Sequence, residues 1–208
     1  MHVTAITTPE TQVEAELINQ MHRLRADVFG GRLSWNVHCI DGMECDAFDS
    51  LRPTYILAVA PGQRVVGSAR LLPASGPTML ELIFPRLLDR GFLNSHHRMI
   101  ESSRFCIDTG VAKERGPGAL NLATSTMFAG IVEWCCLHGY TDIATATDVR
   151  FERILRRAGW PLSRLRNVVD IGNVNGVAGV LSADRACFEC LRPEGYRSSF
   201  AVSSKRAA

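Results

Sequence analysis

Apolar residues in the first quarter of the chain recur at helical spacing. Val13, Leu17, Met21, Leu24 and Val28 form one stripe, which predicts a helix from about residue 10 to residue 28 that starts at Thr8-Pro9 and stops at Gly30-Gly31. Periodicity then nearly disappears between residues 32 and 52. An irregular segment of that length in a compact domain is usually either functional or mobile.

The remaining chain alternates between strand and helix patterns. Two apolar runs, 55–60 and 65–72, flank a Pro-Gly turn and predict a β-hairpin. The elements expected after it are a short helix at 77–88, a strand at 99–108, a glycine-rich loop at 110–118, a helix at 119–138, a strand at 140–147, a helix from Asp148 to 158, strands at 165–171 and 177–181, and a helix at 183–191. This order predicts an α/β sandwich around a mixed sheet.

The predicted strand at 99–108 carries an acid and a base in an otherwise apolar run. Glu101 and Arg104 need partners there, because a buried charge costs several kcal/mol unless it is paired or hydrogen-bonded. Residues three positions apart in a regular strand face opposite sides of the sheet. If both side chains serve one site, the strand must bulge near Ser102-Ser103, as strands often do beside active sites.

Composition narrows the classes of protein that remain. With 46% hydrophobic residues, the 208-residue chain can form one domain over residues 1–208, with only 203–208 expected to be disordered. A net charge of +2 argues against a nucleic-acid binder. There is no signal peptide pattern and no 18-residue apolar run, so we expect a cytoplasmic protein without a membrane association.

Cysteine usage indicates reduced thiols. The seven cysteines are an odd number and are scattered along the chain, which does not suit a disulfide framework. Cys187-Phe-Glu-Cys190 is a single C-x-x-C pair without a nearby histidine. We therefore expect no metal site.

Charged residues of the two signs match in number on or near apolar elements. They are Arg25, Arg70 and Arg104 on one side and Asp46, Asp49 and Glu101 on the other. Such matching is consistent with one shared, partly buried network of bidentate pairs, or with independent surface pairs. Phe29 and Trp35 bracket the acidic segment, and an aromatic face beside carboxylates suits a sulfonium or another soft cation.

The motifs that carry these residues are similar to those of a known family. They are Arg25-Ala-Asp-Val-Phe29, Arg32-Leu-Ser-Trp35, Glu44-Cys-Asp46-Ala-Phe-Asp49, Gly67-Ser-Ala-Arg70-Leu-Leu-Pro73, Pro77-Thr-Met-Leu80 with Phe84, Glu101-Ser-Ser-Arg104-Phe, and the stretch from Phe151 to Pro161. In this order and spacing the chain strongly resembles the acyl-homoserine-lactone synthases, the LuxI-type autoinducer synthases.

This resemblance implies a fold and a reaction. The fold would be a GNAT-like three-layer α/β sandwich around a mixed, mostly antiparallel sheet with a central V-shaped cleft. An acyl group would pass from acyl carrier protein to the amine of S-adenosylmethionine, whose carboxylate would then close the lactone and expel methylthioadenosine. S-adenosylmethionine is a substrate in this scheme, and no cofactor is implied.

The resemblance also suggests residue roles. Glu101, through a water, would be the general base that the protonated amine requires, with Asp46 as a competitor. Arg70 and Arg104 would hold the carboxylates and keep Glu101 ionised. The S-adenosylmethionine pocket would comprise Arg25, Phe29, Trp35, Asp46, Asp49 and Arg104.

The acyl chain and its carrier involve the second half of the sequence. Acyl-binding candidates are Ser103, Met127, Thr145, Thr147 and Leu155. In the family that the sequence resembles, a threonine in the strand at 140–147 favours 3-oxo-acyl chains by hydrogen bonding, so the resemblance implies this role for Thr145 or Thr147. A basic run, continued by Arg164 and Arg166, contains Arg150, Arg153, Arg156 and Arg157. It is either a docking face for acidic acyl carrier protein or an ordinary solvated helix face.

Three alternatives stay open. The first is lactone synthesis with an acyl-coenzyme A donor. The second is a GNAT-type acyl-coenzyme A transfer to another amine, for which the loop from Lys113 to Gly118 would cradle the pyrophosphate. The third is a non-enzymatic sensor on the same fold.

Overall fold

The computed structural model describes residues 1–110, 121–172 and 174–200. The chain divides into two compact units. The first takes its described residues from segments 1–70, 104–131 and 192–208, and the second from segments 71–103 and 132–191. The loop expected from Lys113 to Gly118, the start of the predicted helix at 119 and the tail at 203–208 lie outside the described residues.

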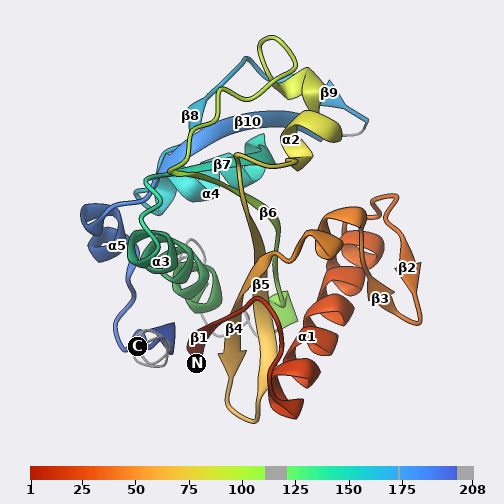
Figure 1. Ribbon diagram of the computed structural model, residues 1–208, viewed down its shortest axis with the longest axis vertical. Helices are drawn as coiled ribbons and strands as arrows, with labels where there is room; N and C mark the ends of the chain where they lie inside the picture. The colour runs from red at the N-terminus through yellow and green to blue at the C-terminus, as the bar shows by residue number, and fades with distance from the viewer. Residues whose placement is uncertain (111–120, 173, 201–208) are drawn as a thin grey trace. The chain divides into compact units, whose positions relative to one another are not determined.

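The first unit is built on a strand pair and a helix that covers it (Figure 1). Strands β4 (Thr54–Ala60) and β5 (Arg64–Pro73) neighbour each other as the predicted hairpin, and β1 (His2–Ile6) pairs antiparallel with β4. Leu17 and Met21 of helix α1 (Gln12–Arg25) pack against Tyr55, Leu57 and Val65. The helix stripe and the hairpin thus form one apolar core.

Helix α1 differs from its prediction at both ends. It begins after Thr11, whose hydroxyl accepts from Glu14 N while the Glu14 carboxylate accepts from Thr11 N. Because of this capping box the helix begins at Gln12 and not at the expected Thr8-Pro9. Val13 is 53% exposed and does not belong to the core. The chain does not stop at Gly30-Gly31 but continues as a π-helical segment, Ala26–Arg32.

Residues 32–52 contain more regular structure than expected. A two-stranded hairpin, β2 (Cys39–Ile40) and β3 (Met43–Glu44), precedes a 3-10 helix, Ala47–Leu51. Asp46 caps this helix by accepting from Phe48 N, and the Asp49 carboxylate accepts from Asp46 N. The two acidic residues are therefore oriented by the local backbone before any contact with the rest of the unit.

Strand β6 (Met99–Ile107) and helix α3 (Leu122–Leu137) were both predicted, and each contributes to both units. In the first unit a Cβ atom at Gly67 would lie 2.7 Å from Ile107 and 2.9 Å from Met127. Real Cβ atoms essentially never show contacts that short, so a larger residue at position 67 would force the side chains of Ile107 and Met127 to shift.

The second unit contains the parallel part of the sheet. The first half of β6 pairs in parallel with β7 (Asp142–Asp148), with Glu101 opposite Ala144. Strand β10 (Val174–Ser182) pairs antiparallel with β7, with β8 (Ser163–Arg164) and with β9 (Val169–Ile171). The sheet is thus mixed and mostly antiparallel, as predicted.

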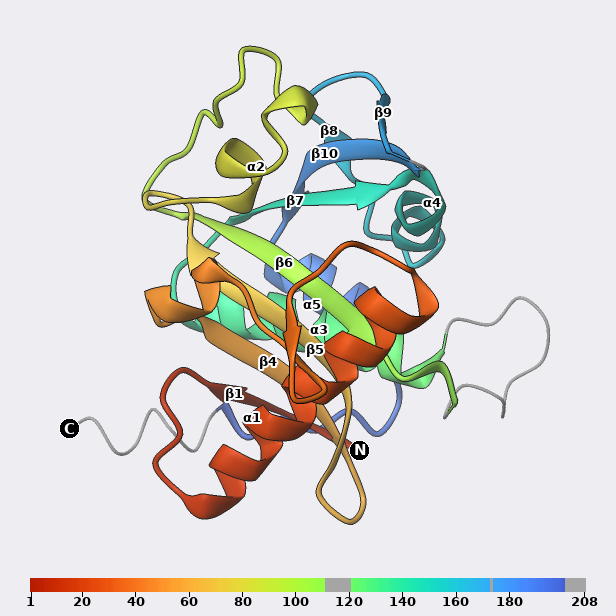
Figure 2. The same cartoon turned by 90° about the vertical axis from the view of Figure 1, so that its right-hand side faces the viewer.

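Several predictions in this unit need correction. A single strand over 165–171 is wrong, since β8 and β9 form instead. The predicted helix at 77–88 is two short pieces, α2 (Met79–Leu82) and a 3-10 turn, Pro85–Leu87. Pro85 lacks the N–H needed to continue a helix. In contrast, α4 (Val149–Arg157) is capped by Asp148 as expected, and α5 (Arg185–Leu191) follows β10 (Figure 2).

No helix among the described residues is both long enough and apolar enough to cross a membrane.

Candidate functional site

A network of buried charges occupies the first unit. It joins three guanidinium groups to three carboxylates: Arg25, Arg70, Arg104, Glu44, Asp46 and Asp49. Three of these residues, Arg25, Arg70 and Glu44, are at most 1% exposed. The equal number of opposite charges allows such burial, because each charge is paired and hydrogen-bonded.

Arg25 lies in the last turn of α1 and connects two carboxylates. Its Nη1 and Nη2 atoms donate to Oδ1 and Oδ2 of Asp49 over 2.9 and 3.0 Å, which is a bidentate pair. Its Nε atom donates to Oε2 of Glu44. Helix α1 thereby fixes both β3 and the 3-10 helix that follows it.

Arg70 and Arg104 complete the network from strands β5 and β6. Arg70 donates to both oxygens of Asp46 and, over 2.8 Å, to Oδ1 of Asp49. Arg104 donates from Nε to Oε1 of Glu44 over 3.1 Å, and its Nη2 lies 2.8 Å from Oδ2 of Asp46. Each carboxylate therefore bridges two guanidinium groups.

The network determines which groups are ionised. Burial by itself would raise the pKa of Asp49, but the hydrogen bonds and charges of Arg25 and Arg70 outweigh burial and hold that pKa well below its usual range. Burial likewise opposes the charged form of Arg25, yet its bonds to Asp49 and Glu44 raise its pKa. Burial and the adjacent Asp49 charge raise the pKa of Tyr55, whose hydroxyl donates to Oδ1 of Asp49 over 2.8 Å.

Aromatic rings line the network. Phe29 and Trp35 are stacked, with ring centroids 5.3 Å apart and planes inclined by 13°. The Arg104 guanidinium carbon lies 5.5 Å from the centre of the Phe29 ring, and that of Arg70 lies 5.3 Å from the centre of the Phe48 ring. Phe29 is buried, whereas Trp35 is 40% exposed. The aromatic pair thus extends from the charged network to the surface.

The backbone of Arg104 adopts a left-handed conformation, with φ at 53°. A non-glycine residue in a strand rarely takes this conformation, which typically marks a bulge or a strained functional position. The strand is irregular as expected, although at Arg104 rather than at Ser102-Ser103. This backbone conformation directs the guanidinium to Glu44 and Asp46.

Glu101 lies in the second unit and has partners that the sequence did not reveal. Its carboxylate is 2% exposed and accepts from Met79 N and Leu80 N, each over 2.8 Å. These main-chain groups form the start of α2, where a negative charge is favourable. The sequence therefore predicted correctly that an acid is buried here, but it could not predict that main-chain N–H groups would be its hydrogen-bond donors.

The predicted acyl-binding residues divide between the units. Met127 belongs to the first unit and is fully buried. The other four belong to the second unit, where Leu155 is buried and Ser103, Thr145 and Thr147 are half-buried. Thr145 and Thr147 alternate along β7 and so share a face, and the Thr145 hydroxyl donates to Ser102 O over 2.8 Å.

The four predicted docking arginines are exposed on α4, namely Arg150, Arg153, Arg156 and Arg157. On the buried side of this helix, Glu152 accepts from Nε and Nη2 of Arg164 over 2.6 Å each. Arg164 lowers the pKa of Glu152 through these bonds. Of the predicted basic run, Arg164 is thus committed to holding α4 in place.

Sequence reasoning missed three members of the site, namely Glu44, Phe48 and Tyr55. Glu44 is the first residue of the motif Glu44-Cys-Asp46-Ala-Phe-Asp49, and its position two residues before Asp46 was the available signal. A further cluster of groups that can bind metals, His22, Cys45 and Asp49, shares Asp49 with the network. Its members are distant in sequence and form no motif.

Comparison with known proteins identifies the class. The autoinducer synthase family matches residues 10–191. An acyl-homoserine-lactone synthase from Rhizobium radiobacter is 55% identical over 206 residues, which cover 99% of this chain and 97% of the relative. The chain therefore belongs to the autoinducer synthase family, and its activity is that of an acyl-homoserine-lactone synthase, an acyltransferase.

Solved structures confirm the fold class. BjaI, a CoA-dependent acyl-homoserine lactone synthase solved with SAM and isopentyl-CoA, has a TM-score of 0.80 at 24% identity and covers 100% of this chain and 99% of its own. An acyl-CoA N-acyltransferase from Pseudomonas aeruginosa has a TM-score of 0.53 at 15% identity and covers 86% of this chain and 97% of its own. The predicted likeness to acyltransferases of the GNAT type is confirmed.

Proposed function

We propose that the enzyme makes its lactone from S-adenosylmethionine and an acyl group carried as a thioester on acyl carrier protein, with the charge network as the S-adenosylmethionine site. The observation that carries this proposal is the buried, charge-balanced network beside the stacked Phe29 and Trp35 rings. S-adenosylmethionine presents an amine, a carboxylate and a sulfonium, and this set of groups offers a partner for each.

Exposure separates the groups that could touch this substrate from those that orient them. The side chains of Asp46, Asp49 and Arg104 are 18%, 11% and 12% exposed, so each retains a surface for a ligand. Arg104 suits the substrate carboxylate, and Asp46 or Asp49 suits the ammonium. The partly exposed ring of Trp35 suits the sulfonium.

Arg25 and Glu44 have fully buried side chains. We assign them positioning roles, because a side chain without exposed surface cannot contact a substrate unless the site rearranges. Arg25 orients Asp49, and Glu44 joins Arg25 to Arg104.

Acylation requires a base, because the amine is an ammonium at neutral pH. Asp46 is the weaker candidate, because its two oxygens accept from the charged guanidinium groups of Arg70 and Arg104 as well as from Phe48 N, whereas Glu101 accepts from two neutral main-chain N–H groups. Glu101 remains our proposed base, acting through a water. Its two main-chain donors hold the carboxylate in a fixed orientation.

The exposed arginines of α4 support acyl carrier protein as the donor. Four basic side chains on one short helix form a local positive patch in a protein of nearly neutral net charge. Such a patch would steer an acidic carrier protein. An acyl-coenzyme A donor, as in BjaI, is the second candidate. In either case Thr147 or Thr145 is proposed to recognise a 3-oxo group.

The test is to incubate the protein with S-adenosylmethionine and a panel of acyl-carrier-protein and acyl-coenzyme A thioesters. Thiol release and methylthioadenosine release are followed together, and we expect both, in equal amounts, with a carrier-protein thioester. Thiol without methylthioadenosine would indicate simple acyl transfer and contradict lactone synthesis. Turnover with coenzyme A thioesters alone would contradict the proposed donor.

A further inference from the structure

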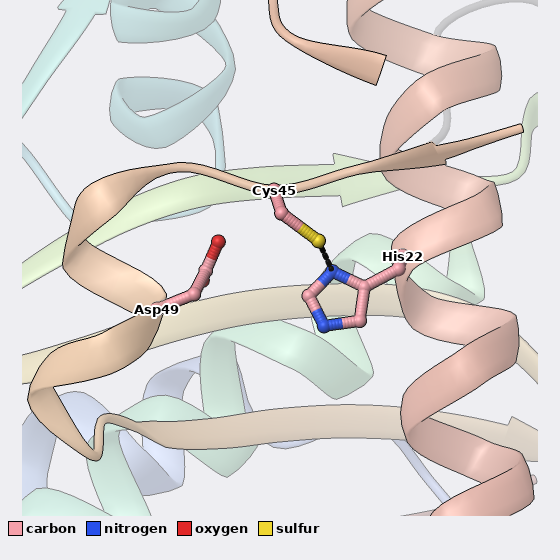
Figure 3. Close-up of side chains that lie close together, drawn as sticks. All are labelled: His22, Cys45 and Asp49. Atoms are coloured by element: carbon pink, nitrogen blue, oxygen red, sulfur yellow. Dashed lines mark hydrogen bonds between the residues drawn. The ribbon is translucent and has the colours of Figure 1, made fainter. Parts of the chain in front are cut away.

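Three side chains at the edge of the network, one of them its member Asp49, offer ligand types that zinc prefers (Figure 3). His22 projects from α1, Cys45 directly follows β3, and Asp49 belongs to the 3-10 helix. One ligand atom from each lies within 4.8 Å of the others. Among the described residues this is the only cluster of at least three histidine, cysteine or acidic residues with such spacing.

The spacing is close to that of a zinc site. Zinc bonds imidazole nitrogen at about 2.0–2.1 Å and thiolate sulfur at about 2.3 Å, so a tetrahedral site holds these two atoms roughly 3.5 Å apart. Nδ1 of His22 and Sγ of Cys45 are 3.3 Å apart. Nδ1 of His22 donates a hydrogen bond to the carbonyl oxygen of Glu44 over 2.8 Å, because a carbonyl can only accept. Binding an ion at Nδ1 therefore replaces that bond and moves the ring proton to Nε2. The pair His22–Cys45 thus has nearly the spacing of a zinc site, whereas Asp49, within 4.8 Å of both, must move closer to complete it.

A zinc ion and the hydrogen bonds of the network would compete for the carboxylate of Asp49. Asp49 accepts five hydrogen bonds, from Arg25 twice and once each from Arg70, Tyr55 and Asp46 N. A carboxylate has about four acceptor sites, so an ion bound to Asp49 must replace at least one of these bonds. The groups displaced are the ones that orient the proposed substrate site.

We propose that His22, Cys45 and Asp49 bind a zinc ion and that zinc and S-adenosylmethionine weaken each other's binding. On binding, a zinc–sulfur bond replaces the thiol S–H bond of Cys45, and the proton passes to solvent. The zinc site itself is independent of the proposed function, whereas the antagonism depends on it. The site departs from our expectation of no metal because its ligands come from three separate elements.

Zinc binding is tested first, by measurements that do not depend on enzyme turnover. The metal-free full-length protein is titrated with Zn²⁺ by calorimetry, and with Co²⁺ while the thiolate-to-cobalt absorption band is followed. We expect one high-affinity site per chain and the thiolate band. Cys45→Ser should weaken zinc binding by about 100-fold and abolish the band.

Cys39→Ser is the matched control, because Cys39 is an exposed cysteine in the adjacent strand β2. This variant should keep both the affinity and the band. Equal losses in both variants, or no loss in Cys45→Ser, would overturn the site. His22→Gln should match Cys45→Ser, and its thermal unfolding shows whether the fold is intact. Mg²⁺ should not bind, because thiolate and imidazole are poor ligands for it.

The antagonism is tested by measuring S-adenosylmethionine affinity with and without Zn²⁺. Affinity should fall about tenfold in the wild type and in Cys39→Ser, but remain constant in Cys45→Ser. If zinc binds but the affinity for S-adenosylmethionine does not change, the proposed antagonism is wrong and the proposed zinc site stands. If S-adenosylmethionine does not bind at all while zinc does, the proposed function fails and the metal site stands.

Discussion

Arg25 in the first unit and Arg153 in the second are the same residue type at the two extremes of solvent exposure. Arg25 is fully buried and bonds two carboxylates, whereas Arg153 is exposed on α4. Removing a buried partner leaves an uncompensated charge, which costs far more than the pair contributes. Exposed charges act mainly on encounter with other molecules. The two regions should therefore respond very differently to the same substitution.

Replacing each arginine with methionine tests this comparison most directly. Arg25→Met leaves Glu44 and Asp49 without their common donor and should lower the free energy of unfolding by about 3–5 kcal/mol. Arg153→Met should leave stability unchanged. Urea unfolding of both variants measures the difference. A loss below 1 kcal/mol in Arg25→Met would show that the network tolerates a missing charge.

Much of the architecture could be predicted from the periodicity of apolar residues, and the predictions that were wrong have physical causes. The β4–β5 hairpin, β6 and α4 have strong local patterns and matched the structure. The expected strand at 165–171 failed because pairing with β10 decides which residues there become extended. Strand β1 was missed because five residues alone carry little signal and depend on β4 for pairing.

The part of the site that consists of pairs between charged side chains could be predicted from the sequence. Matching numbers of arginine and acidic residues predicted a shared network, and the structure pairs Arg25, Arg70 and Arg104 with Asp46 and Asp49. Hydrogen-bond donors on the main chain, in contrast, cannot be predicted from the types of the side chains. The donors to Glu101 are backbone groups of α2, whose position depends on tertiary packing.

The second prediction concerns Glu101. Glu101→Gln removes the proposed base, and because an amide nitrogen cannot accept, it also removes one of the two main-chain hydrogen bonds to α2. We expect kcat to fall about 10²–10⁴-fold with S-adenosylmethionine affinity retained, which separates loss of the base from loss of the fold. Stopped-flow release of thiol measures the acylation step.

Glu81→Gln is the matched control, because Glu81 also accepts from a main-chain N–H, that of Leu93. Its turnover should stay within about twofold of the wild type. A similarly small change in Glu101→Gln would assign Glu101 to holding α2 alone, and Asp46 would then become the candidate base.

The third prediction is the pH dependence of stability. The pKa of Asp49 is lowered in the folded state, from an unfolded value of about 3.9. Its contribution is therefore complete above about pH 5 and is lost as the pH falls below 3.9 towards the folded value. The difference in unfolding free energy between the wild type and Asp49→Asn should shrink over that range. Urea titrations from pH 7 to about pH 3 measure it, and a constant difference would contradict the assigned ionisation.

The smallest effect is expected at α4, and it depends on salt. Arg153→Glu combined with Arg156→Glu should raise KM for an acyl-carrier-protein thioester about tenfold at low ionic strength. The effect should disappear near 1 M salt, where charges are screened beyond about 3 Å. Since Glu152 and Arg164 still hold the helix, stability should not change. An equal rise in KM for an acyl-coenzyme A thioester would show that these arginines act on a feature common to both donors, and carrier-protein docking would no longer explain the basic face.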